Sequence, residues 1–183
     1  MKTKFLKSEH IFLKPLSIND DLCEYESWLN DQETTRFMGS GKFPISSDSL
    51  KDYITRMNNS TNDFLLGIFL CENKKHIGNL TLEHIDWIHR KAELGLVIGD
   101  KDCLGKGYAR EIVNLMLEHC FERLNLNKIT AGMVSINLAS KKLFENCGFV
   151  LEGTMKNEFF LDDNYYDIYR YGILRETHIK KQS

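Results

Sequence analysis

Apolar residues recur along this chain at two spacings, and each spacing predicts a different kind of secondary structure. A spacing of three to four residues predicts helices, whereas short apolar or alternating runs bounded by turn residues predict strands. The helical spacing is clearest over Gly107–Leu124, where apolar side chains form one stripe. It also predicts a helix capped by Ser17 that runs to about Leu29, a helix that begins at Ser46 or Ser47, and a short helix over Leu138–Cys147.

The strand pattern recurs in seven segments. These are His10–Leu16, Phe64–Cys71, His76–Trp87, Lys91–Ile98, Asn127–Ser135, Phe149–Phe160 and Tyr165–Leu174. The second, third and fourth segments are joined by short turns and predict an antiparallel meander, and the last two predict a hairpin around Asp162-Asp163-Asn164. Residues 31–44 are expected to form a loop, and His178–Ser183 a frayed end. The predicted fold class is therefore α+β, with helices packed on one mixed sheet.

Composition narrows the class of protein. A chain of 183 residues with 42% hydrophobic and 27% charged residues predicts one globular domain, residues 1–183, with a core from about 9 to 175. A formal charge of −2 argues against a protein that binds nucleic acid through its phosphates. There is no apolar run of about 18 residues and no signal peptide, so we expect no membrane span. Five cysteines without a C-x-x-C pair predict reduced thiols in a cytoplasmic protein, with no metal site.

The segment Ile98–Arg110 carries the most chemical information. A strand ends, a loop with Gly105 and Gly107 follows, and the long helix begins, which leaves unpaired backbone N–H groups at the positive end of a helix dipole. Such a position binds phosphate, and Lys106 and Arg110 add positive charge. The segment lacks the Ser or Thr of a P-loop after Lys106 and the third glycine of a dinucleotide-binding fingerprint.

Two separated motifs resemble those of the GCN5-related N-acetyltransferase (GNAT) family. The loop Leu104-Gly105-Lys106-Gly107-Tyr108-Ala109 is similar to the family's pyrophosphate loop, Gln/Arg-x-x-Gly-x-Gly/Ala, except at its first position. The second motif is Asn137-x-x-Ser140, a short helix, and Asn146-Cys147-Gly148-Phe149. The loop form, His89–Glu93 and Glu158-Phe159-Phe160 resemble the branch that holds the ribosomal-protein-alanine and spermidine acetyltransferases.

The resemblance implies a splayed, mostly antiparallel sheet that takes acetyl-CoA between the strands at Leu94–Ile98 and Asn127–Ser135. Backbone N–H groups from about Leu104 to Arg110 would hold the pyrophosphate, and the Leu96–Ile98 region and Asn137 would hold the pantetheine arm. Asn137 is equally suited to cap the helix that follows it. The implied cofactor-binding residues are Leu96, Ile98, Leu104, Gly105, Lys106, Gly107, Tyr108, Ala109, Arg110, Asn137, Ser140 and Phe144.

An N-acetyltransferase must deprotonate an amine, and this requirement selects candidate bases. A lysine-like amine has a pKa of about 10.4, so its deprotonation near pH 7 costs roughly 4–5 kcal/mol and a base helps. Glu93 is the first candidate, because it precedes the pantetheine-binding section, although it could instead pair with a cation. Glu83 is the second and His84 the third.

Phe144 departs from the family at the place of the general acid. Many members have a tyrosine four residues before the helix-ending glycine, here Gly148, and phenylalanine cannot donate a proton. A free thiol has a pKa of about 8.5, so thiolate release near pH 7 costs only about 2 kcal/mol. We expect the thiolate to leave unassisted, or with a proton from water, Ser140 or a tyrosine.

The acceptor site is expected at the first two helices, their loop and the last hairpin. The candidate acceptor-binding residues are Trp28, Arg36, Phe37, His84, Glu158 and Tyr165. The acidic hairpin suits a cationic amine, whereas Arg36 suits an acceptor with a phosphate or carboxylate. We therefore expect acetylation of a small-molecule primary amine, such as a polyamine, amino sugar or amino acid. The alternatives are a peptide N-terminus as acceptor, or a silent acyl-CoA-binding module. A homodimer is left open.

Overall fold

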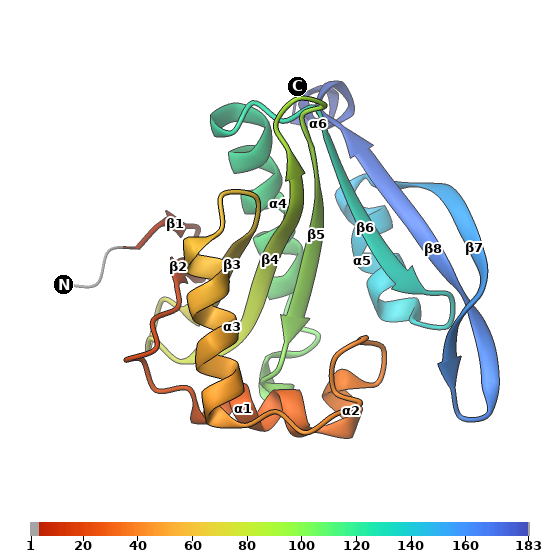
Figure 1. Ribbon diagram of the computed structural model, residues 1–183. Coiled ribbons are helices and arrows are strands. Elements are labelled where there is room, and N and C mark those ends of the chain that lie inside the picture. The colour runs from red at the N-terminus through yellow and green to blue at the C-terminus, as the bar shows by residue number, and fades with distance from the viewer. Residues whose placement is uncertain (1–3, 183) are drawn as a thin grey trace.

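The computed structural model describes residues 4–182 and contains one eight-stranded sheet (Figure 1). Its strand order is β1-β2-β3-β4-β5-β6-β8-β7. The strands are β1 (Leu6–Lys7), β2 (Ile11–Pro15), β3 (Phe64–Leu70), β4 (His76–Asp86), β5 (Lys91–Ile98), β6 (Lys128–Val134), β7 (Val150–Leu161) and β8 (Asn164–Leu174). Every neighbouring pair is antiparallel except β5 and β6, so the predicted mostly antiparallel sheet is confirmed.

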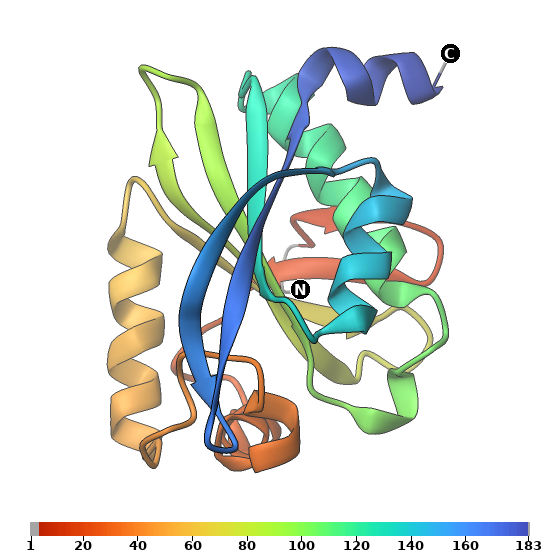
Figure 2. The same ribbon diagram turned by 90° about the vertical axis from the view of Figure 1, so that its right-hand side faces the viewer.

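Helices cover both faces of the sheet (Figure 2). The helices are α1 (Cys23–Asn30), α2 (Gln32–Thr35), α3 (Ser47–Asn59), α4 (Tyr108–Glu118), α5 (Leu138–Cys147) and α6 (Arg175–Gln182). Helices α1 and α3 lie on one face, and α4 and α5 on the other. In the described part of the chain, no helix is long and apolar enough to cross a membrane.

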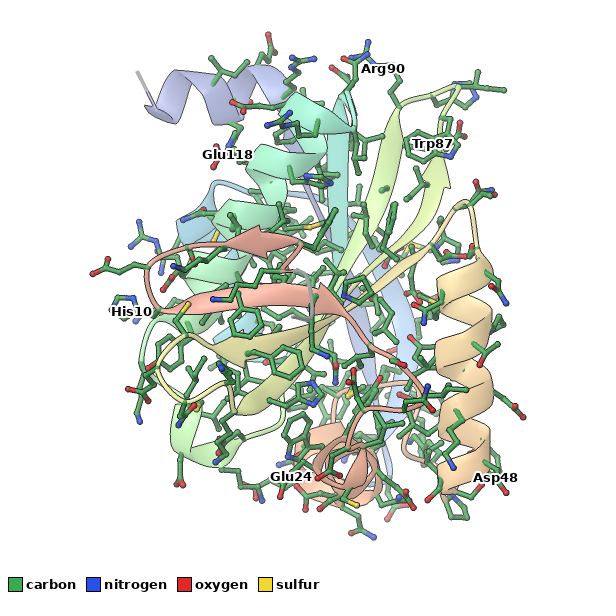
Figure 3. The ribbon with its side chains drawn as sticks, turned by 90° about the vertical axis from the view of Figure 1, so that its left-hand side faces the viewer. His10, Glu24, Asp48, Trp87, Arg90 and Glu118 are labelled. Atoms are coloured by element: carbon green, nitrogen blue, oxygen red, sulfur yellow. The ribbon has the colours of Figure 1, made fainter. Side chains whose placement is uncertain are left out.

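Strands β5 and β6 pair only at one end, and this geometry opens the sheet. Their register covers Lys91–Glu93 against Lys128–Thr130 and stops there. The paired end is held by Arg90, whose guanidinium donates to the backbone carbonyl and side-chain oxygen of Asn125 at 2.7 and 2.8 Å. Figure 3 shows Trp87 and Arg90 at that end of the molecule, and Glu24 and Asp48 at the opposite end. The two strands diverge toward the opposite end (Figure 1), as the splayed sheet requires.

Two apolar cores, one on each face, fix this shape. The predicted stripe of the long helix is buried against the sheet, with Ile112, Val113 and Met116 at most 1% exposed. On the other face, Leu50 and Ile54 of α3 pack with Tyr25 and Trp28 of α1. Burial of one such side chain stabilises the fold by about 1.5–3 kcal/mol, so both faces resist separation of the layers.

The first predicted helix begins later than expected. Its N-cap was expected at Ser17, but α1 begins at Cys23. The Ser17 hydroxyl accepts a hydrogen bond from the Asn19 N–H, and the Asp20 carboxylate accepts from the Ser17 N–H at 3.0 Å. These side chains form a local turn, in competition with the helix start.

Three further expectations are corrected. The predicted loop over residues 31–44 contains the short helix α2, whose first turn is capped by the Asp31 carboxylate. The long helix ends in a π-helical turn over His119–Arg123 rather than continuing as α-helix to Leu124. The expected frayed end, His178–Ser183, is helical as far as Gln182, since buried His178 packs 5.3 Å from the Phe121 ring; Ser183 lies outside the described residues.

Candidate active site

The loop that enters α4 presents a run of open backbone donors. Gly105 and Gly107 have φ angles of +72° and +85°, which only glycine adopts readily. In the part of the chain that the structure describes, the backbone N–H groups of residues 105–109 donate no hydrogen bond to the protein. Successive free N–H groups at a helix N-terminus attract anions. The loop can therefore hold a phosphate group, as its sequence predicts.

Leu104 and Arg110, at the two ends of the predicted donor run, do not offer free backbone N–H groups. The Leu104 N–H donates to the Lys101 carbonyl at 3.2 Å, and the Arg110 N–H donates to the Gly107 carbonyl at 3.1 Å. Neither backbone group is thus open to a ligand. The Leu104 side chain is 57% exposed, and the side chains of Lys106 and Arg110 lie at the surface. Of these three side chains, only the positive charges of Lys106 and Arg110 are available to an anion at the loop.

A cavity of about 630 Å³ occupies the gap between the diverging strands. It is lined by the part of β5 that has lost its β6 partner, by Gly132 and Met133 of β6, and by the start of α5. Four residues predicted to hold the cofactor lie on its wall, namely Leu96, Asn137, Ser140 and Phe144, whereas Ile98 does not. The unpaired edge of β5 can bind an extended chain through its main-chain groups, in the manner of an added strand.

Asn137 and Phe144 tie the start of α5 to this cavity. The Asn137 side-chain oxygen caps the helix by accepting from the Ser140 N–H at 3.1 Å, while the residue also lines the cavity. Both roles considered for Asn137 are thus compatible with the structure. Phe144 is 5% exposed and its ring packs edge-on against Phe149 at 5.0 Å. Phe144 therefore supplies an apolar wall where a tyrosine would supply a hydroxyl.

Glu83 is the candidate base that lies in the cavity. It comes from β4, and burial raises the pKa of its carboxyl above the ordinary value. Burial also raises the pKa of neighbouring Tyr53 to about 12, with a contribution from the Glu83 charge. Within residues 4–182, no hydrogen bond or ion pair holds the Glu83 carboxylate. A half-buried, unengaged carboxylate of this kind suits a general base.

Glu93 is engaged elsewhere. Its carboxylate accepts from the Arg170 guanidinium at 2.6 Å, and the residue does not line the cavity. The pair passes over Gly132, where a Cβ would lie 3.0 Å from Arg170 and 3.3 Å from Glu93. Glycine at this position of β6 therefore lets the ion pair bridge β5 and β8. This is the cation pairing that was weighed against a catalytic role for Glu93.

The residues predicted to bind the acceptor do not lie together in the structure. Phe37 lines the cavity, but Trp28 is buried in the core, where its ring packs so closely on Gly99 that any side chain at residue 99 would clash. His84, at φ +54°, is the extra residue of a bulge in β4 and lies at the surface outside the cavity. Three predicted residues, Arg36, Glu158 and Tyr165, are exposed and do not line the cavity.

Several cavity residues escaped the sequence analysis. Tyr25, Tyr53 and Thr81 line the cavity, as does Asn79, whose side-chain nitrogen is buried without a partner among residues 4–182. The two tyrosines share helix faces with core residues, so helical spacing alone assigns them to the core. Alternation along β4 puts Asn79, Thr81 and Glu83 on one face, and this was the signal that could have grouped them.

Comparison with known proteins agrees with this geometry. A family model described as an acetyltransferase (GNAT) domain matches residues 10–150. The chain is 38% identical over 108 residues to spermidine N(1)-acetyltransferase of Vibrio cholerae. This match covers 59% of this chain and 62% of that protein, so the chain spans less than two thirds of that relative's length. It is 25% identical over 177 residues to the putative ribosomal N-acetyltransferase YdaF of Bacillus subtilis, covering 92% and 93%.

A solved structure shares the whole fold. The crystal structure of spermidine N-acetyltransferase from Vibrio cholerae in complex with CoA and spermine superposes with a TM-score of 0.84 at 29% identity. The superposition covers 92% of this chain and 98% of that one.

Proposed function

Since the chain belongs to the acetyltransferase (GNAT) family, we propose that it transfers an acetyl group from acetyl-CoA to the primary amine of a small molecule. Polyamines are the first acceptors to consider, because the Vibrio cholerae relative is named for spermidine and its structure holds spermine. The observation that carries the proposal is the cavity in the splayed sheet, with the donor loop that enters α4 and an unengaged carboxylate at Glu83.

The chain offers a place for each part of acetyl-CoA. The N–H groups of residues 105–109 suit its diphosphate, and the free edge of β5 suits the amides of its pantetheine arm. Asn137 and Ser140 suit the end of that arm, where they line the cavity. When bound, acetyl-CoA supplies a thioester carbonyl, which the acceptor nitrogen attacks directly.

Glu83 replaces Glu93 as the first candidate for the base. Glu83 lies in the cavity and burial raises the pKa of its carboxyl toward neutrality, which improves a base that works near pH 7. Glu93 forms its ion pair with Arg170 and, in this proposal, holds the strands together. Proton donation to the leaving thiolate falls to Ser140 or water, because Phe144 has no proton to give.

The loop that follows α2 favours a small acceptor over a peptide. A peptide N-terminus needs an open groove between this loop and the last hairpin. Arg36 instead pairs with Asp162 of the hairpin at 3.0 Å, and Lys42 donates to the Phe160 carbonyl at 3.1 Å. The two contacts link the loop to the hairpin where a peptide would have to enter, so acetylation of a protein N-terminus is the second candidate. A single-domain organisation over residues 1–183, a cytoplasmic location and a homodimer stay predictions.

The test is release of free thiol from acetyl-CoA with separate panels of polyamines, amino sugars, amino acids and peptides with free N-termini. We expect turnover with small primary amines and little with peptides. Turnover confined to peptides would favour the second candidate. Tight acetyl-CoA binding without turnover on any panel would instead identify a silent acyl-CoA-binding module.

A further inference from the structure

We infer that the acceptor is recognised by one ammonium group and the hydrocarbon beside it, so that the further charges of a polyamine gain no partner in the cavity that the described residues form. The inference rests on the proposed function and specifies the acceptor of the same cavity. It concerns the distribution of charge in and around that cavity.

The cavity has one charged side chain on its wall. In the described part of the chain, Glu83 is the only Asp, Glu, Lys or Arg among the lining residues. The wall on the α1–α3 side is mostly apolar or aromatic and carries no charged side chain. Its apolar and aromatic members include Tyr25, Leu29, Phe37, Ile45, Leu50 and Tyr53, and Thr34, Ser40 and Ser49 add hydroxyl groups. A buried ammonium needs a counter-charge, and aromatic faces add to its binding. The cavity therefore provides for one cation and a hydrocarbon segment, and for no second cation.

Three carboxylates around the cavity and on the last hairpin are already paired with cations of the protein. Glu93 pairs with Arg170 at 2.6 Å, and Asp162 at the hairpin tip pairs with Arg36 at 3.0 Å. Farther along the hairpin, Asp167 pairs with Lys156 at 2.8 Å. Two carboxylates of the acidic hairpin, Asp162 and Asp167, are thus neutralised from within, whereas the exposed carboxylates of Glu158 and Asp163 form no ion pair among residues 4–182. A second or third ammonium at Asp162 or Asp167 would have to displace the existing pair.

Two cations of the protein also lie around the cavity. The Arg56 guanidinium stacks 5.2 Å from the ring of Tyr53, a cavity residue. The Lys42 ammonium lies 5.5 Å from the ring of Phe159, just beyond the lining segment that includes Gly39 and Ser40. Neither cation forms an ion pair within residues 4–182, although the Arg56 charge acts on the carboxylates of Glu83 and Asp63. Both oppose the approach of a polycation, whereas a monoamine buries its single charge at Glu83.

Three acceptors of equal chain length test the inference: n-nonylamine, 1,8-diaminooctane and spermidine, with one, two and three amino groups. We expect kcat/KM for n-nonylamine to equal that for spermidine within threefold or to exceed it. A value for spermidine more than threefold higher would overturn the inference while leaving the proposed function in place. Absence of thiol release with every small amine would count against the proposed function itself.

A variant pair tests the cause. Arg36→Ala frees the Asp162 carboxylate and should raise kcat/KM for spermidine relative to n-nonylamine by about threefold or more, about 0.65 kcal/mol. Lys7→Ala, which removes one positive charge from the distant strand β1, is the matched control and should leave that ratio unchanged. An unchanged ratio in Arg36→Ala, or an equal rise in both variants, would show that the Arg36–Asp162 pair does not set the charge preference.

Discussion

At the scale of single residues, the glutamates Glu83 and Glu93 both lie on sheet strands but differ in the charges around them. Glu83 and Glu93 are register partners on neighbouring strands, so both side chains lie on the same face of the sheet. Arg170 forms an ion pair with Glu93, whereas no cation of the described chain forms an ion pair with Glu83. Burial raises the pKa of the Glu83 carboxyl. Only the carboxylate without a partner can accept a proton from the acceptor without losing an ion pair.

The two carboxylates are distinguished by their amide variants. Glu83→Gln should lower kcat at pH 7 by about 100-fold or more, because general base catalysis typically contributes that much. The loss should shrink at high pH, where the amine loses its proton without help. Glu93→Gln should lower kcat by less than about tenfold and to the same extent at every pH. The measurement is the pH profile of thiol release, and the opposite assignment of the two profiles would restore Glu93 as the base.

At the scale of elements, the functional site is made where elements end. The free N–H groups belong to the turn before α4, Asn137 caps α5, and the open edge of β5 begins where pairing with β6 stops. Each of these positions leaves backbone groups without a partner inside its own element. A ligand that accepts and donates hydrogen bonds can satisfy them, which makes these element ends suited to binding.

Gly107→Leu tests the donor loop. A side chain at this residue meets nothing in the protein, but it would project from the loop that the ligand must approach, and we expect acetyl-CoA affinity to fall at least tenfold. Calorimetry gives the affinity, and thermal unfolding without ligand gives the separate cost of a leucine at φ +85°. Gly153→Leu, in open space without a positive φ, is the control. Unaltered affinity in Gly107→Leu would remove the loop from the site.

At the scale of the whole molecule, one sheet serves two cores. Ile54 packs in the α1–α3 core and Ile112 in the core under α4 and α5, and both are fully buried. The cores share the strands that separate them, so loss of one core exposes one face of the same strands whose other face supports the second core. This coupling keeps β5 and β6 at a fixed divergence, on which the cavity depends.

Ile54→Ala and Ile112→Ala should therefore each destabilise the protein by about 2–5 kcal/mol in a single unfolding transition. Denaturant unfolding followed by circular dichroism and by tryptophan fluorescence gives the measurement, since Trp28 reports on the α1–α3 core. The two signals should coincide in both variants. Separate midpoints for the two probes would show that the cores unfold independently.

The sequence by itself determined the order along the chain of strands β2–β8 and of helices α1, α3, α4 and α5, the apolar stripe of α4, the hairpin of β7 and β8, and the glycine loop; it did not predict β1, α2 or α6. These features depend on residue spacing and backbone preference, which are local properties of the chain. The predicted helix start at Ser17 and the predicted frayed end from His178 were wrong because a local side-chain turn at Ser17 and the packing of His178 on Phe121 decided these positions.

Only the tertiary structure decided which charges are free. The pairing of Glu93 with Arg170 joins residues 77 positions apart, and the pairing of Arg36 with Asp162 joins residues 126 apart. No spacing in the sequence records such contacts, because they depend on how the strands are ordered and how far β5 and β6 diverge. Electrostatic interaction depends on distance in space and on burial, so the choice of base and the charge of the acceptor follow from the folded arrangement alone.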